Sequence, residues 1–180
     1  MKLTLILGGV RSGKSRFAQE LAAGLGPKVL FVATGQPLDE EMNSRIEAHK
    51  KSRPPTWRAL EAPTDIAGAI SHELGDAEAV IIDCLTLLVS NIMGGKEYLE
   101  VEQLWRKVAA ELEALTSFMK TSPAHFIIIS NEVGLGVVPP YPSGRVYRDI
   151  LGLANQMLAQ HAEEVYLMIA GIPIPLFKKK

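Results

Sequence analysis

Short apolar runs alternate along the chain with longer segments in which apolar residues recur every three or four positions. The short runs predict strands over 2–7, 29–33, 57–60, 79–83, 126–130 and 165–170. The segments with helical spacing predict helices over 14–25, 39–51, 64–75, 85–93, 97–120 and 145–161. Because strands alternate with helices, we expect a mostly parallel sheet with helices on both faces, an α/β fold in three layers.

Apolar stripes on two of the predicted helices indicate which side chains face the core. On the helix over 14–25 the stripe is Phe17, Leu21 and Leu25. On the helix over 97–120 it is Leu104, Val108, Leu112 and Leu115. After the last predicted strand, the basic end at 178–180 is expected to be a solvated tail.

The bulk composition fits one globular domain over residues 1–180. The chain has 47% hydrophobic and 22% charged residues, a net charge of −1 and a single cysteine, Cys84. This charge balance does not favour nucleic acid or an anionic membrane as a partner, and one cysteine leaves no internal disulfide framework. No apolar run reaches the roughly eighteen residues of a membrane helix, and the first residues show no signal-peptide pattern. We therefore expect a cytoplasmic enzyme with no membrane span.

The first predicted strand runs straight into a complete phosphate-binding loop of the pattern G-x-x-x-x-G-K-S. Its residues are Gly8, Gly9, Val10, Arg11, Ser12, Gly13, Lys14 and Ser15. Glycines in such a loop let backbone N–H groups approach phosphate oxygens, and the following helix directs its positive end at them. We expect Lys14 to contact the outer phosphates of a nucleotide and Ser15 to ligate Mg²⁺. A glycine turn without a ligand is the alternative, which the completeness of the motif disfavours.

Polar residues also follow other predicted strands: Thr34, Gly35 and Gln36 after 29–33, Asp83 at the end of 79–83, and Asn131 and Glu132 after 126–130. In a parallel sheet these positions share one edge with the phosphate loop, where ligands gather. We expect Asp83 to hold Mg²⁺ through water beside Ser15, with helix capping as the alternative. Asp83 and Glu132 are candidate bases for a kinase reaction.

His49 stands at the head of a basic run near the end of the helix predicted over 39–51. The run is Lys50, Lys51, Ser52 and Arg53. The simple interpretation is a partly buried histidine, followed by charges that complement the helix dipole. The alternative is that the basic run meets phosphates and that His49, as a neutral imidazole, is a nucleophile. Spacing alone leaves both interpretations open.

Several segments, in order along nearly the whole chain, resemble one family. They are the GGVRSGKS loop, 34–36 with 39–42, 45–50, Arg53-Pro54 with Trp57, 130–134 with Val138-Pro139, and Arg148-Asp149 with Asn155-Gln156. Together they resemble the bifunctional adenosylcobinamide kinase / adenosylcobinamide-phosphate guanylyltransferase of cobalamin biosynthesis. The loop by itself is generic, whereas the segments around His49 and after Ser130 are specific to that family.

The resemblance implies a RecA-like phosphate-loop fold, a homotrimer and two reactions. ATP or GTP first phosphorylates a hydroxyl of adenosylcobinamide; GTP then guanylylates a histidine, and the GMP passes to adenosylcobinamide phosphate. The matching histidine is His49, which follows Ala48 where many relatives carry a second histidine. The implied nucleotide contacts are Gly8 to Ser15, Thr34 to Gln36, Lys50 to Arg53, Glu61 and Asp83. The apolar segment over 85–93 is a candidate wall for the corrinoid or, like the loop after Asn131, a contact between subunits.

Two other functions use the same loop. A simple ATP-dependent small-molecule kinase would need Lys14, Ser15 and Asp83 but would leave His49 idle. A nucleotide-switch protein would signal occupancy through loop movement. The segment around His49 disfavours both, since neither function requires a histidine beside a basic cluster.

Overall fold

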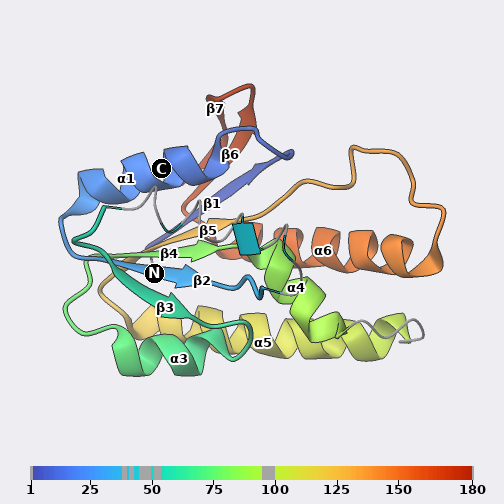
Figure 1. The fold of residues 1–180 in the computed structure, drawn as a ribbon, viewed down its shortest axis with the longest axis horizontal. Helices are drawn as coiled ribbons and strands as arrows, with labels where there is room; N and C mark the ends of the chain where they lie inside the picture. Colours follow the sequence, from blue (N-terminus) through green and yellow to red (C-terminus); the bar gives the residue numbers. More distant parts are fainter. Residues whose placement is uncertain are drawn as a thin grey trace.

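The computed structural model describes residues 2–37, 40, 43–44, 50, 54–94 and 100–179. Its elements, labelled as in Figure 1, are β1 (Lys2–Gly8), α1 (Lys14–Leu25), β2 (Val29–Ala33), β3 (Arg58–Glu61), α3 (Ile66–Glu73), β4 (Ala79–Asp83), α4 (Leu85–Met93), α5 (Val101–Thr121), β5 (His125–Ile129), α6 (Pro142–His161), β6 (Glu164–Ile169) and β7 (Ile172–Lys178). The bounds of α1, β2, β4 and α4 are those that the sequence predicts.

One sheet organises the described part of the chain, with the strand order β3-β2-β4-β5-β1-β6-β7. Every neighbouring pair is parallel except β6 and β7, which are antiparallel. Helix α1 lies over one face of the sheet, whereas α3, α4, α5 and α6 lie over the other (Figure 1). The predicted three-layer α/β fold is therefore confirmed, and the carboxyl ends of the parallel strands share one edge.

The central strands are apolar on both faces because both faces are covered. In β1, the side chains of Leu3 and Leu5 belong to the core shared with α5 and α6. The side chain of Ile6 points the other way and packs with Ala18 and Ala22 of α1. The small side chains of Ala18 and Ala22 let α1 pack closely against this face of the sheet.

The two predicted helix stripes fare differently. The stripe of α5 is buried along its length, as expected. In α1 the residues facing the sheet are instead Ala18 and Ala22, and Leu25 is 40% exposed. Because α1 lies so close to the strands, its larger side chains Phe17 and Leu21 pack at the flank of that contact.

The basic end over 178–180 differs from the expected solvated tail. Its first residue, Lys178, closes the edge strand β7, and the Lys179 N–H donates a hydrogen bond of 2.8 Å to the Glu163 carbonyl. The Lys178 ammonium forms an ion pair of 2.7 Å with the Glu164 carboxylate on β6. At another boundary, α6 begins at Pro142 rather than at residue 145, because a proline suits the first turn of a helix. The helix predicted over 39–51 lies largely outside the described residues.

Candidate functional site

The phosphate loop follows β1 and has a backbone that only glycine accommodates at two positions. Gly8 has φ 152° and Gly13 has φ 96°. A Cβ atom at Gly8 would lie 2.6 Å from the Met168 carbonyl oxygen, and one at Gly13 would lie 3.1 Å from the Cα atom of Gly171. Both glycines therefore let the loop fold closely against the end of β6 and the turn that follows it.

Lys14, the first residue of α1, curls back over the loop. Its Nζ donates hydrogen bonds to the Gly8 carbonyl at 3.0 Å and the Gly9 carbonyl at 2.6 Å, and the residue is 9% exposed. Burial lowers the pKa of the Lys14 ammonium, and the nearby Cys84 and Asp83 oppose that shift. The ammonium is thus held against the backbone of the loop, and its contact with the outer phosphates of a nucleotide stays a prediction.

The Ser15 hydroxyl and the Asp83 carboxylate meet across the sheet edge. Ser15 Oγ donates a hydrogen bond of 2.9 Å to Asp83 Oδ2, which joins the start of α1 to the end of β4. Magnesium takes oxygen ligands and is typically held by one or two protein groups together with substrate phosphates and water. Among the described residues, no group of three or more His, Cys, Asp or Glu side chains forms a protein-only metal cage. The pair therefore fits Mg²⁺ bound together with a nucleotide.

One side-chain atom of the phosphate loop, the hydroxyl oxygen of Ser12, is buried without a hydrogen-bond partner among the described residues. Among the described residues, Ser12 Oγ and Asn155 Oδ1 are the buried side-chain oxygens or nitrogens that lack a hydrogen bond. Leaving such a group unpaired costs about 1–3 kcal/mol. The unpaired Ser12 hydroxyl in the phosphate loop is consistent with a site shaped for an anionic ligand.

Thr34, which is predicted to contact nucleotide, is buried, and its side-chain hydroxyl already forms hydrogen bonds within the protein. The Thr34 hydroxyl donates to the Cys84 carbonyl at 2.7 Å and accepts the Cys84 N–H at 2.8 Å. The Thr34 carbonyl accepts an N–H of Asn91 at 2.7 Å. The Thr34 side chain therefore holds the backbone of Cys84 in position. Gly35 and Gln36 follow Thr34 at the sheet edge, and Gln36 is exposed.

Glu61 ends β3 at the same sheet edge, on the strand farthest from β6 and β7. Its carboxylate forms an ion pair of 3.1 Å with the Lys50 ammonium. Because β2, β4 and β5 separate β3 from β1, Glu61 and Lys50 lie along the edge from the phosphate loop. The other predicted residues of this segment, His49, Lys51, Ser52 and Arg53, lie outside the described residues.

A polar corner after β5 was only partly visible in the sequence. The Asn131 N–H donates to Thr86 Oγ1 at 3.0 Å, and the Asn131 carbonyl accepts the Asn155 amide at 3.2 Å. Tyr147 donates its hydroxyl to the Thr86 carbonyl at 3.0 Å. Asn131 and Asn155 belong to segments that the sequence analysis identified. Thr86 and Tyr147 lie in no recognisable motif, and so no signal in the sequence pointed to them.

Comparison with known proteins identifies the family. The family profile described as "Cobinamide kinase / cobinamide phosphate guanyltransferase" matches residues 4–176. The chain belongs to this family. It is therefore a bifunctional enzyme, a cobinamide kinase and cobinamide phosphate guanyltransferase.

Curated relatives agree with this cobinamide kinase / guanyltransferase assignment over nearly their full length. The chain is 38% identical over 180 residues to the "Bifunctional adenosylcobalamin biosynthesis protein CobU" of Salmonella typhimurium, covering 97% of this chain and 99% of the relative. It is 38% identical over 183 residues to the protein of that name from Escherichia coli, with the same coverage. It is 40% identical over 172 residues to "Bifunctional adenosylcobalamin biosynthesis protein CobP" of Pseudomonas aeruginosa, covering 96% of this chain and 95% of the relative.

A solved structure supports the fold of this cobinamide kinase / guanyltransferase. The "Crystal structure of the RadB recombinase" superposes with a TM-score of 0.50 at 15% sequence identity, covering 92% of this chain and 73% of that chain. The likeness concerns the fold alone, and it agrees with the RecA-like phosphate-loop architecture that we expected. No described helix is long and apolar enough to span a bilayer.

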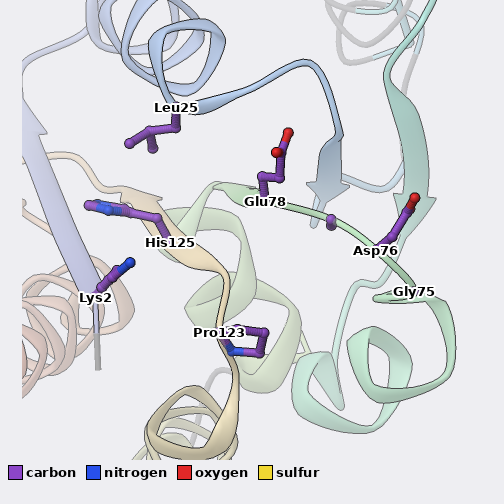
Figure 2. A pocket seen from close by; sticks show the side chains of 8 residues that line it. Lys2, Leu25, Gly75, Asp76, Glu78, Pro123 and His125 are labelled. Carbon is purple, nitrogen blue, oxygen red and sulfur yellow. The ribbon is translucent and has the colours of Figure 1, made fainter.

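A well-formed hollow of this enzyme lies at the opposite end of the sheet from the phosphate loop. Figure 2 shows this pocket of about 400 Å³, which is lined by Lys2, Leu25, Gly75, Asp76, Ala77, Glu78, Pro123 and His125. Its acids already have partners, since Asp76 pairs with the Lys28 ammonium at 2.8 Å and Glu78 accepts the Lys28 N–H at 3.2 Å. None of the residues that line this pocket belongs to the site expected from the sequence, which lies at the other edge of the sheet around Lys14, Ser15 and Asp83.

Proposed function

We propose that the enzyme first transfers the γ-phosphoryl group of ATP or GTP to a hydroxyl of adenosylcobinamide, and then transfers GMP from GTP to the phosphorylated product. The hydrogen bond between Ser15 and Asp83 beside the buried Lys14 is the observation that best supports this proposal. An ammonium, a hydroxyl and a carboxylate close to one another could together bind Mg²⁺ and neutralise the charge that develops in phosphoryl transfer. The corrinoid substrate is a small molecule, and no nucleic acid takes part.

The nucleotide extends, in this proposal, from the phosphate loop along the carboxyl edge of the sheet. The backbone N–H groups of Gly9 to Lys14 hold the phosphates, and the segment at Gly35 and Gln36 lies between them and Glu61. Mg²⁺ would be held by Ser15 and Asp83 and would neutralise charge that develops on the phosphate oxygens. The Glu61 carboxylate accepts hydrogen bonds from ribose hydroxyls or guanine N–H groups once GTP displaces Lys50 from it.

His49 is the proposed nucleophile of the guanylyl step. Its imidazole attacks the α-phosphorus of GTP, the bond to the β-phosphate oxygen breaks, and pyrophosphate leaves. The adjacent Lys50, Lys51 and Arg53 supply positive charge to the polyphosphate. The family assignment and the ion pair that holds Lys50 at the end of β3 support this placement.

Labelling with GTP that carries a radioactive α-phosphate tests the guanylyl step. The wild-type protein should retain label after denaturation, and the label should survive alkali but be lost in mild acid, because protonation makes imidazole a good leaving group. His49→Asn should take up no label while still phosphorylating adenosylcobinamide. His72→Asn, an exposed substitution on α3, is the matched control and should label normally. Undiminished labelling of His49→Asn would show that another residue is the nucleophile.

The enzyme is further proposed to act in the cytoplasm as a homotrimer. Exposed apolar residues support a contact surface in the loop after Asn131, where Leu135 is 82%, Val137 94% and Tyr141 74% exposed. The segment over 85–93 stays a second proposed surface, for a neighbouring subunit or for the corrinoid. Leu85 and Val89 are at most 1% exposed and pack within their own core, so such a contact would fall on the partly exposed Leu87, Ile92 and Met93. Light scattering that found only monomer at micromolar concentration would contradict the trimer.

A further inference from the structure

The carboxyl end of β5 opens directly onto the phosphate site. Strand β5 lies between β1, which leads into the phosphate loop, and β4, which ends at Asp83. The chain leaving β5 passes Ser130 and Asn131, and the N–H of Glu132 then donates a hydrogen bond of 3.2 Å to the Gly8 carbonyl. Glu132 is thus attached through its backbone to the first residue of the phosphate loop.

Two helices hold the preceding residue of this corner in place. Both polar groups of the Asn131 backbone form hydrogen bonds with side chains. The Thr86 hydroxyl on α4 accepts the Asn131 N–H, and the Asn155 amide on α6 donates to the Asn131 carbonyl. Asn155 is only 6% exposed, and its Oδ1 has no hydrogen-bond partner among the described residues. An unpaired buried oxygen lowers the stability of the folded state. A segment without regular structure is therefore fixed beside the phosphate loop at some expense in stability.

The Glu132 side chain is itself oriented by its own loop. Its Oε1 accepts the N–H of Gly134 at 2.8 Å, and no ion pair among the described residues engages the carboxylate. Asp83 differs, because one of its oxygens accepts the Ser15 hydroxyl on the metal side of the site. Asp83 and Glu132 are thus two described acids beside the phosphate loop. The Glu132 carboxylate is oriented by the Gly134 N–H, whereas the Asp83 carboxylate accepts the hydroxyl of Ser15, the proposed metal ligand.

We propose that Glu132 is the general base of the kinase step, an inference that rests on the proposed function. The hydroxyl oxygen of adenosylcobinamide forms a bond to the γ-phosphorus, and the bond from that phosphorus to the bridging oxygen breaks. The nucleoside diphosphate leaves with the electron pair, the Glu132 carboxylate takes the hydroxyl proton, and the resulting acid returns that proton to water. The guanylyl step uses an imidazole and then a phosphate as nucleophiles, and so it needs no such base.

Gly134 provides a way to move the carboxylate without removing it. A Cβ atom at Gly134 would lie 2.9 Å from Glu132 Oε1, whereas one at Gly136 would lie 3.6 Å from the Val133 carbonyl, an ordinary contact. Neither glycine has a positive φ. Gly134→Ala should therefore displace the Glu132 carboxylate, and Gly136→Ala is its matched control.

The experiment measures phosphorylation of adenosylcobinamide from γ-labelled nucleotide, together with protein labelling from α-labelled GTP. Glu132→Gln should lower kcat for phosphorylation about 10²- to 10⁴-fold, with KM for the nucleotide little changed. Its protein labelling and its thermal unfolding midpoint should match the wild type. Gly134→Ala should lower kcat about tenfold because the base is misplaced, and Gly136→Ala should behave like the wild type.

Two results would overturn the proposal. One is a kcat for Glu132→Gln within about threefold of the wild type, because a general base contributes more than that. The other is a loss of phosphorylation and protein labelling together in a folded Glu132→Gln variant, since Glu132 would then serve the nucleotide site in general. Equal rates for Gly134→Ala and Gly136→Ala would overturn the placement of the carboxylate. If the wild type takes up no label, the histidine intermediate fails, while the phosphorylation rates still decide the task of Glu132.

Discussion

Thr34 and Cys84 form a reciprocal pair in which one hydroxyl satisfies both backbone groups of one residue. Thr34 Oγ1 donates to the Cys84 carbonyl and accepts the Cys84 N–H, at 2.7 and 2.8 Å. The pair ties the end of β2 to the residue after Asp83, and so it holds two neighbouring strands together where they meet the nucleotide edge. The hydroxyl of Thr34 therefore has a structural role, and a nucleotide contact by this residue stays a prediction.

Removing that hydroxyl should destabilise the protein. Thr34→Val keeps the side-chain shape but leaves the Cys84 N–H without its hydrogen-bond acceptor, whereas the Cys84 carbonyl still accepts the Leu88 N–H at 3.2 Å. The free energy of unfolding should therefore fall by about 1–3 kcal/mol. Thr34→Ser keeps the hydroxyl and should lose only about 1 kcal/mol for its missing methyl group. Urea unfolding followed by circular dichroism compares the two. Equal stability of the two variants would contradict the structural task of the hydroxyl.

Lys14→Ala should abolish both activities while the protein stays folded. Without the ammonium, the charge that develops on the outer phosphates loses its closest cation, and each rate should fall at least about 10²-fold. Lys107→Ala removes an exposed cation from α5 and should change neither rate. Normal turnover of a folded Lys14→Ala variant would refute the assignment of the phosphate loop.

Asp83→Asn should change the response to magnesium in both reactions. The amide can still accept the Ser15 hydroxyl, but it lacks the negative charge that favours a divalent cation. The Mg²⁺ concentration for half-maximal rate should rise about tenfold or more. Asp76→Asn also removes one negative charge, at the far end of the sheet, and should leave the magnesium titration unchanged. A similar shift in both variants would mean that the effect is one of net charge.

Acid should weaken the fold through His125. Burial lowers the pKa of the His125 imidazole, and the nearby Glu163 and Glu164 oppose that shift. Because the folded state disfavours the protonated ring, this contribution to stability is present above the ordinary histidine pKa of about 6.5. It is lost as the pH falls through the lower, folded-state value.

Urea unfolding between pH 5 and 8 measures this dependence. The free energy of unfolding should fall toward the acid end in the wild type. The decline should be smaller in His125→Gln, whose amide can keep a hydrogen bond to Thr4, the present partner of the ring at 2.8 Å. Parallel pH profiles for the two proteins would assign the acid sensitivity to other groups.

Much of the fold follows from simple patterns in the sequence. The buried strands β2 and β4 are short apolar runs because helices cover both faces of the sheet, and their predicted bounds are those observed. Strand β7 could not be predicted in this way. All of its residues are exposed, and Pro173 and Pro175 interrupt it, a combination that only an edge strand tolerates.

In the site, too, residues specified by local sequence patterns were predicted, and residues brought together only by the fold were not. Lys14, Ser15 and Asp83 were predicted because a contiguous motif and a strand end specify them, and the observed hydrogen bond between Ser15 and Asp83 confirms that they meet. Thr86 and Tyr147 escaped prediction because their task depends on helices brought together only in the folded chain. Thr86 is 45 residues from Asn131, and Tyr147 is 61 residues from Thr86. The nucleophilic task of His49 stays a prediction.

The position of β1 within the sheet sets an order for synthesis of the protein on the ribosome. Its partners are β5 and β6, and so the first strand has no sheet neighbour until residues 125–129 have left the exit tunnel. The carbonyl of Ser12 in the phosphate loop accepts the N–H of Gly171, and the loop packs against the end of β6. The nucleotide motif is therefore synthesised long before the strands and the turn that pack against it in the folded chain. The phosphate loop gains its full set of contacts only after the residues of the turn between β6 and β7 have been added.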